Sequence, residues 1–193
     1  EDAAVLERCL ARRGVTHLDA VLITHKDADH CGALSALAGV VRIDHVYIHA
    51  DLLDEDFEKG VLEAARWATG GKGAEGVTPG SKLKAGEFSI TIVAPENGGK
   101  SENEDSLVSL LEYDAENDGI VDARGLLTGD AEAQATKDVV NKVGKIDLLK
   151  VPHHGSRGGL TADELSRLSP SIAVIGVGAN NRYGHPNPET LEL

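Results

Sequence analysis

Three short apolar segments of this chain each run into histidine or aspartate side chains, and this arrangement constrains the fold more than any other feature. Residues 18–24 (LDAVLIT) lead into four such side chains within positions 25–30. Residues 125–128 (GLLT) are followed, after one glycine, by Asp130, and residues 147–151 (DLLKV) are followed, after one proline, by two histidines. Because open α/β sheets place their sites at the carboxyl ends of strands, we expect three neighbouring strands with their polar ends at one edge.

The remaining pattern alternates helices and strands, as in an α/β fold. Apolar periodicity predicts helices over 3–13, 31–37, 56–69, 131–143 and 161–168, and further strands over 40–49, 88–94, 106–113 and 172–177. Thr161 and Glu164 have the spacing of a capping box. Residues 70–86 are rich in glycine and lysine and predict an exposed loop or hairpin connection without a domain boundary. We therefore expect one domain over residues 1–193.

The composition excludes several classes of protein. The 193 residues are 41% apolar and 26% charged, which is enough for one well-buried domain. A net charge of −13 argues against a broad basic face for nucleic acid, although metal ions could reverse the potential locally. Two cysteines leave the redox compartment open. No apolar run is long enough to span a membrane, so we expect this chain to be soluble. The sequence contains no methionine, so we expect it to be a piece of a longer protein.

The four potential ligands in the first polar cluster are His25, Asp27, Asp29 and His30. Alternate residues of an extended segment point the same way, so the first three can converge while His30 turns back as a helix begins. Such a dense group of carboxylates and imidazoles favours divalent cations as counter-charges, and one loop could serve two of them. The alternative is a solvated polar loop with an aspartate helix cap.

The second group of potential ligands is Asp130, His153 and His154. Taken singly, Asp130 suits the N-cap of a helix from 131 onward, and a lone His-His-Gly could be a turn. Together with the first cluster, they predict a metal centre.

Several motifs resemble one known family. The segment THKDADHCG resembles the THxHxDHxG signature of the metallo-β-lactamase fold, and LLTGD and KVPHHGS are similar to its later aspartate and histidine motifs. Within that superfamily the sequence resembles the soluble domain of ComEC/Rec2 competence proteins, through HKDADH, DSLVSLLEY, LLTGD, LLKVPHHGS and VGANNRYGHPNPE in this order. The resemblance covers nearly the whole chain and implies a metallo-β-lactamase-like αββα sandwich.

The resemblance also implies a ligand set. One metal would be held by His25 and Asp27, a second by Asp29, His30 and one of His153 or His154, and Asp130 would bridge both. Asp27 stands where most of the superfamily has histidine, so the first site has a harder donor and suits manganese relatively better than zinc. We expect up to two divalent ions, zinc or manganese.

Two departures from the family pattern accompany this set. The usual lone histidine before Asp130 is missing, and Asn103, Asp105 or Ser106 could approach its position. The family's N-terminal β-hairpin, which precedes the first helix, also has no counterpart in this chain.

Two adjacent cations would yield a metal-bound hydroxide at neutral pH and neutralise charge on a phosphoryl oxygen. We expect Asp29, Asp130 and His185 to be catalytic, with His185 protonating the leaving oxygen, although it could equally be a loop residue packed against Tyr183 and Pro186. The weaker candidates for orienting a substrate are Lys150, Ser156, Arg157, Asn181 and Arg182. Asn180 and Asn181 could instead simply form a turn.

Three further histidines, at 17, 45 and 49, have no ligand-like neighbours and are expected to be structural or exposed, and Trp67 is expected to pack in a helix. The few aromatic residues provide little surface for base stacking, so a nucleic acid would be held through its phosphates.

The resulting expectation is a metal-dependent phosphodiesterase or nuclease domain of a bacterial DNA-uptake membrane protein. It would act on DNA or another phosphodiester at the extracytoplasmic face, beside the membrane-embedded remainder of its own chain. One alternative is a hydrolase of small molecules that uses metal. The other is a metal-poor domain that gates a channel or docks to it.

Overall fold

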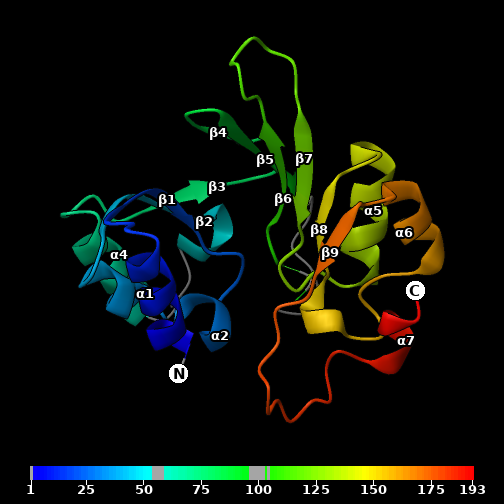
Figure 1. The fold of residues 1–193 in the computed structure, drawn as a ribbon. Coiled ribbons are helices and arrows are strands. Elements are labelled where there is room, and N and C mark those ends of the chain that lie inside the picture. Colours follow the sequence, from blue (N-terminus) through cyan, green and yellow to red (C-terminus); the bar gives the residue numbers. More distant parts are fainter. Residues whose placement is uncertain (1, 54–58, 96–102, 104) are drawn as a thin grey trace. The chain divides into compact units, whose positions relative to one another are not determined.

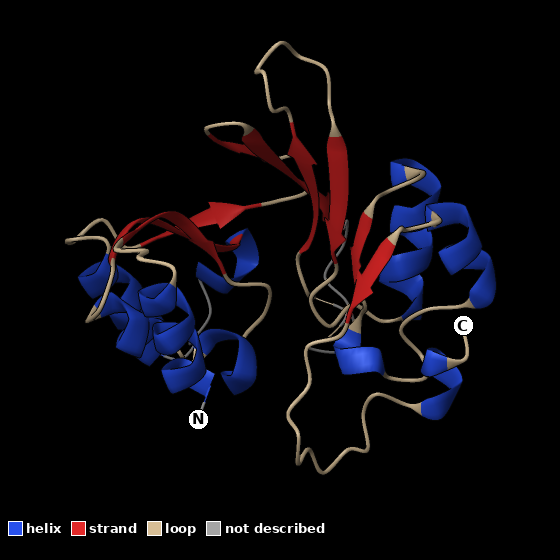
Figure 2. Cartoon of the chain, viewed as in Figure 1, coloured by secondary structure: helices blue, strands red, loops and turns tan. Residues whose placement is uncertain are grey.

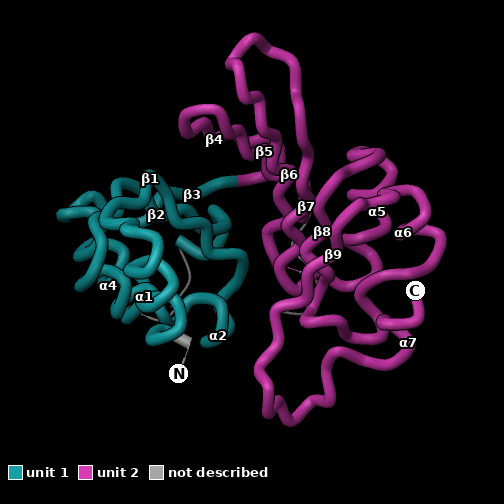
Figure 3. The backbone as a smooth tube through the Cα atoms, in the orientation of Figure 1, with its two compact units in different colours: residues 1–77 teal, residues 78–193 magenta. Residues whose placement is uncertain are grey.

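Helices and strands alternate over the first 77 residues and again from β7 (Ala123–Leu127) onward, whereas strands β3 (Ala74–Val77) to β7 follow one another with no helix between them in the described part of the chain (Figure 1). The computed structural model describes every residue except 1, 54–58, 96–102 and 104. The chain divides into two compact units, residues 1–77 and 78–193 (Figure 3). A single domain over residues 1–193 stays a prediction.

The first unit contains a three-stranded parallel sheet in the order β1-β2-β3. Its strands are β1 (His17–Leu22), β2 (Arg42–His49) and β3 (Ala74–Val77). Its helices are α1 (Asp2–Arg12), α2 (Ala28–Cys31), α3 (Leu34–Ala38), the 3₁₀ turn η1 (Ala50–Leu53) and α4 (Lys59–Ala68). Figure 2 shows α1 and α4 on one side of this sheet. The core includes Ile43, Val46, Ile48, Leu34 and Ala65, all buried.

The second unit contains a six-stranded sheet in the order β4-β5-β6-β7-β8-β9. Its strands are β4 (Lys82–Ala85), β5 (Phe88–Ala94), β6 (Val108–Tyr113), β7 (Ala123–Leu127), β8 (Leu148–Lys150) and β9 (Ile172–Val174). Pairing is antiparallel from β4 to β7 and parallel from β7 to β9. Its helices are α5 (Ala133–Val143), η2 (His153–Gly155), α6 (Ala162–Leu168) and α7 (Pro188–Leu191).

The parallel part of this sheet brings two site segments to one edge. Leu127 pairs with Lys150 in the register of β7 and β8, so the residues that follow both strands leave the sheet side by side. The helices that make the crossovers, α5 and α6, contact each other, and Leu126, Leu149, Val139 and Leu168 form the core beneath them.

The capping box is confirmed: the Thr161 hydroxyl accepts a hydrogen bond from the Glu164 amide at 3.3 Å, and the Thr161 amide donates to Glu164 Oε2 at 2.8 Å. The other predicted strands and helices are also present, most with shorter bounds. Residues 56–58 of the predicted helix over 56–69 lie outside the described residues, as do 54 and 55 before it.

The prediction of one helix over 31–37 is wrong. The chain forms α2 and α3 instead, with Gly32 and Ala33 between them. A Cβ atom at Gly32 would lie 2.4 Å from the carbonyl oxygen of Ala28, so the tight end of α2 requires glycine there.

The segment over 70–86 contains the hairpin that was predicted as one alternative, together with a strand that was not predicted. It supplies β3 to the sheet of the first unit and β4 to a hairpin with β5. Trp67 also differs from expectation, because its side chain is 61% exposed on α4. Among the described residues, no helix combines the length and the apolarity that a bilayer crossing needs.

Candidate metal centre

The hydroxyl of Thr24 lies between two of the predicted ligands. Its Oγ1 atom is 3.0 Å from Nδ1 of His25 and 3.3 Å from Nδ1 of His30, and the two rings lie 4.1 Å apart. When the hydroxyl accepts from both Nδ1–H groups, both Nε2 atoms keep their lone pairs for a ligand. The end of β1 therefore presents a pair of histidines held in a defined orientation.

Each Nε2 atom of this pair faces a carboxylate. Nε2 of His25 lies 3.6 Å from Oδ2 of Asp27, and Nε2 of His30 lies 3.6 Å from Oδ2 of Asp29. His25 is buried, whereas the Asp29 side chain is more than half exposed. We call His25, Asp27, Asp29 and His30 the first cluster.

Asp27 occupies the N-cap position of α2, yet its side chain makes no capping hydrogen bond. Asp27 therefore does not cap α2 through its side chain. The loop over residues 25–30 is also stabilised by the Cys31 thiol, which donates a hydrogen bond to the Lys26 carbonyl at 3.2 Å.

Asp130 is almost completely buried at the end of β7, where its residue is 3% exposed. Its amide donates to Oγ of Ser106 at 3.1 Å, and its carboxylate lies 3.4 Å from the Lys150 ammonium and 3.1 Å from Nε2 of His154. Helix α5 begins at Ala133 with Glu132 at the N-cap. The alternative reading of Asp130 as the helix cap is therefore wrong.

The adjacent histidines have different surroundings, although both adopt left-handed backbone conformations in η2. Nδ1 of His154 hydrogen-bonds the Gly176 carbonyl at 2.6 Å, which leaves Nε2 facing Asp130. The hydrogen bond to Asp130 raises the pKa of His154 to about 9, despite partial burial. We call Asp130, His153 and His154 the second cluster.

His153 turns toward a different group of side chains. Its Nε2 atom lies 3.5 Å from Nδ2 of Asn103, and its Nδ1 atom lies 3.8 Å from Oε1 of Glu132. Its ring also meets the ring of His185, with centroids 5.7 Å apart. The His-His-Gly motif thus forms a turn, as one alternative predicted, and also presents two imidazoles to different partners.

His185 packs against Tyr183, as the alternative of a loop residue predicted, and it also lies near the second cluster. Its ring stacks on Tyr183 at 6.0 Å between centroids. Burial and the nearby charges of His153 and His154 lower the pKa of His185. Among the described residues, Nδ1 of His185 is buried without a hydrogen-bond partner.

The predicted substrate contacts are mostly engaged within the second unit. The Asn181 side chain bonds the backbone of its own loop, accepting from the His185 amide at 2.9 Å and donating to the His185 carbonyl at 2.7 Å. Arg157 pairs with Glu189 at 2.8 Å, and Arg182 donates to the Tyr183 hydroxyl at 2.9 Å. Ser156 is half-buried at the end of η2.

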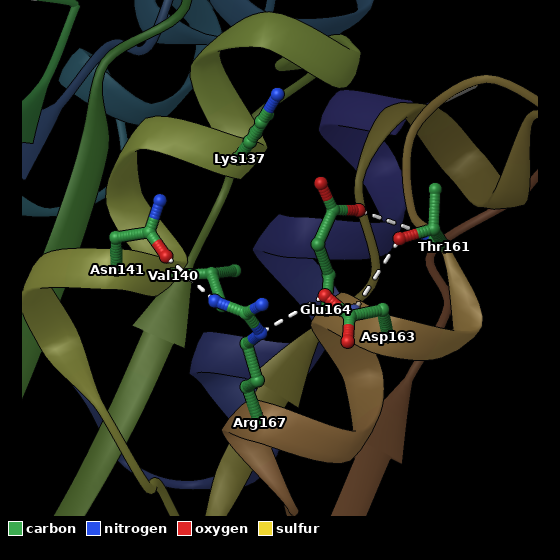
Figure 4. Close-up of a pocket in the computed structure, with 7 residues that line it drawn as sticks. All are labelled: Lys137, Val140, Asn141, Thr161, Asp163, Glu164 and Arg167. Atoms are coloured by element: carbon green, nitrogen blue, oxygen red, sulfur yellow. Dashed lines mark hydrogen bonds and ion pairs between the residues drawn. The ribbon is translucent and has the colours of Figure 1, made fainter.

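A pocket of about 270 Å³ opens between α5 and α6, and none of the residues that line it belongs to the predicted site. Figure 4 shows Arg167 reaching Asn141 on one side and Asp163 on the other. Glu164 serves the capping box in the same pocket. Because most of these polar groups pair with one another, we do not place the functional site here.

Some contributors to the site carry no sequence signal of their own. Thr24 follows the apolar strand β1 like any other polar or β-branched residue, and the Gly176 carbonyl is a backbone group. By contrast, Asn103 and Ser106, named as substitutes for the missing histidine, do approach His153 and Asp130 respectively. Their position just before the strand predicted over 106–113 was the sequence signal for them.

The order of these motifs and the fold around them match a known family. The sequence profile of the beta-lactamase superfamily domain matches residues 2–155. The chain belongs to this superfamily. Its metallo-β-lactamase fold implies divalent metal binding, and the membership supports a metal-dependent hydrolase-like domain.

Curated relatives at the sequence level are bacterial proteins much longer than this chain. ComE operon protein 3 of Bacillus subtilis is 33% identical over 98% of this chain, and this match covers 24% of that protein. Recombination protein 2 of Haemophilus influenzae is 28% identical over 95% of the chain and 20% of its own length. Competence protein ComA of Neisseria gonorrhoeae is 27% identical over 90% of the chain and 22% of its own length.

Solved structures share the fold at low sequence identity. CmlA, a diiron β-hydroxylase of Streptomyces venezuelae, superposes with a TM-score of 0.58 and 15% identity, covering 89% of this chain and 40% of its own. The metallo-beta-lactamase fold protein YhfI of Bacillus subtilis gives 0.56 and 19%, covering 90% and 73%. The fold class expected from the sequence is therefore confirmed.

The donor atoms present fit divalent ions. Tetrahedral ligands about 2.1 Å from one ion lie about 3.4 Å apart. The separations of 3.6 Å within the first cluster and 3.1 Å between Asp130 and His154 are close to this value. The Gly176 carbonyl supplies the kind of second partner that orients a metal-binding histidine.

Proposed function

We propose that this chain is a metal-dependent phosphodiesterase, and specifically a nuclease domain of a protein that takes up DNA. The observation that carries the proposal is the buried Asp130 carboxylate beside Nε2 of His154, at the ends of two adjacent parallel strands. The relatives named as competence and recombination proteins support the substrate class.

As the resemblance to the superfamily implies, the proposed metal ligands are drawn from the first and second clusters. His25 and Asp27 would hold one ion, and Asp29, His30 and His154 a second, with Asp130 shared by both. We prefer His154 to His153 because His154 has both the carbonyl partner and the carboxylate neighbour. The donor set contains both imidazoles and carboxylates, so zinc and manganese are both suitable occupants.

When bound, such ions supply water activation and neutralise the charge that develops on a phosphoryl oxygen. The side chains of the chain itself complete the reaction. Thr24 holds His25 and His30 in orientation, and Asp29 and Asp130 fix the reacting centre. His185 would deliver a proton to the leaving oxygen, since its ring lies against that of His153 near the second cluster.

The wider setting belongs to the same proposal. The substrate is DNA or another phosphodiester, held through its phosphates because the chain has few aromatic residues. The chain spans about a quarter or less of the length of its curated relatives, so the remainder of such a protein would supply the membrane anchor. We place the domain at the extracytoplasmic face, where incoming DNA arrives.

The test is hydrolysis of DNA and of bis-nitrophenyl phosphate with Mn²⁺ or Zn²⁺ added. Asp29→Ala and Asp130→Ala should each lower turnover at least about 100-fold, since even the loss of an outer partner of a metal ligand costs roughly 10–100-fold. The matched controls are Asp19→Ala and Asp138→Ala, which remove exposed aspartates.

The outcomes separate the candidate functions. Unchanged turnover in either ligand variant would contradict the proposal. Turnover of the small ester without cleavage of DNA would favour a small-molecule hydrolase. A wild-type chain that retains no metal would favour the metal-poor docking domain.

A further inference from the structure

Lys150, the last residue of β8, places its ammonium group beside a proposed metal ligand. The Nζ atom donates to the Gly129 carbonyl and lies 3.4 Å from Oδ1 of Asp130. The Lys150 side chain is 22% exposed and that of Asp130 only 5%. An ammonium group therefore sits beside the second cluster.

The backbone on both sides fixes this arrangement. The Thr128 hydroxyl donates to the Lys150 carbonyl at 2.7 Å, which joins the ends of β7 and β8. Gly129 has a positive φ of 52°, which turns its carbonyl and the following Asp130 out of the strand. The Ser106 hydroxyl then holds the Asp130 amide at 3.1 Å. The ammonium group and the carboxylate are thus kept together by groups that bind no metal.

Two opposite electrostatic effects follow from this placement. A buried carboxylate needs a counter-charge, and Lys150 supplies one whether or not a metal is bound. A divalent cation on the same carboxylate would be repelled by the ammonium group a few ångströms away.

We infer that Lys150 is a resident counter-ion of Asp130 that stabilises the metal-free chain and weakens divalent metal binding. The inference rests on the proposed function, because it takes Asp130 as a metal ligand. It gives Lys150 a positioning role through Asp130, in place of the expected contact with substrate.

The first measurement is the Mn²⁺ dissociation constant by calorimetric titration of the chelator-treated chain. Lys150→Met should bind Mn²⁺ at least about tenfold more tightly than the wild type, because the repulsion is removed. Lys150→Arg keeps the charge and should stay within about threefold of the wild type. The control is Lys137→Met, which removes an exposed charge from the pocket of Figure 4 and should leave the affinity unchanged.

The second measurement is the melting temperature in excess chelator. Lys150→Met should melt at least about 3 °C below the wild type, since Asp130 then loses the ammonium group and keeps His154 as a basic neighbour. The same substitution in an Asp130→Asn background should have little further effect, because the carboxylate is already gone. Lys150→Gln provides the same comparison if the methionine variant does not fold.

The results distinguish the two proposals. A wild type that binds no Mn²⁺ would overturn the proposed function. A wild type that binds Mn²⁺ while Lys150→Met binds it equally or more weakly would overturn the inference alone. Equal melting temperatures of wild type and Lys150→Met in chelator would overturn it as well.

Discussion

Nε2 of His154 lies 3.1 Å from Oδ2 of Asp130, while its Nδ1 atom is held by the Gly176 carbonyl at 2.6 Å. The neighbouring His153 faces Asn103 and the ring of His185 instead. Two consecutive residues of identical type therefore have separate surroundings, which distinguishes their expected roles.

The first prediction concerns this pair of histidines. His154→Ala should weaken Mn²⁺ binding at least about tenfold more than His153→Ala, because only His154 has both a ligand-like neighbour and an orienting carbonyl. Calorimetric titration of both variants measures the difference. Equal losses, or a larger loss in His153→Ala, would show that the choice of His154 is wrong.

The second prediction concerns the hydroxyl that contacts both histidines of the first cluster. Thr24→Val keeps the shape but removes Oγ1, so His25 and His30 lose their shared partner. Metal affinity should fall by roughly 10–100-fold, as for other outer partners of metal ligands. Thr24→Ser retains the hydroxyl and is the control. Identical metal affinities in the valine and serine variants would show that the Thr24 hydroxyl does not orient the metal-binding histidines.

The third prediction concerns the carboxylate at position 27, where the superfamily pattern has histidine. Asp27→His replaces an oxygen donor with a nitrogen donor beside His25, so preference should shift from Mn²⁺ toward Zn²⁺. Competitive titration with both metals measures the ratio of dissociation constants. An unchanged ratio would place Asp27 outside the coordination sphere.

The fourth prediction is independent of the metal. Thr161→Ala removes the cap of α6 and should lower the free energy of unfolding by about 1 kcal/mol. Thr161→Ser should keep most of the stability, because its hydroxyl can accept the same bond from the Glu164 amide. Denaturant unfolding of the three chains provides the comparison, and equal losses in both variants would count against the capping role.

The strands and the capping box could be predicted because their signals are local. A run such as 88–94 (FSITIVA) buries alternate apolar side chains, and Thr161 with Glu164 has a fixed spacing. The division of 31–37 into two helices comes with a break at Gly32 and Ala33, which the apolar periodicity does not reveal. Strand β3 was missed because its pairing with β2, which is distant in sequence, creates it from a glycine-rich segment, whereas β4 forms the hairpin with the neighbouring β5 that the sequence offered as one alternative.

The candidate site, like the fold, could be predicted from the sequence only in part. Residue types and spacing identified the two clusters, because unusual densities of histidine and aspartate need a chemical reason. The partners of those residues follow from tertiary contacts: the ammonium group of Lys150 on Asp130, the hydroxyl of Thr24, and the engagement of Asn181 with its own loop. The ligand set and the catalytic residues remain predictions.

The most direct test of the central claim is a crystal structure of the Mn²⁺-soaked chain with anomalous diffraction data. The account predicts an anomalous peak within about 2.5 Å of both His154 Nε2 and Asp130. The absence of a peak at this pair would contradict it.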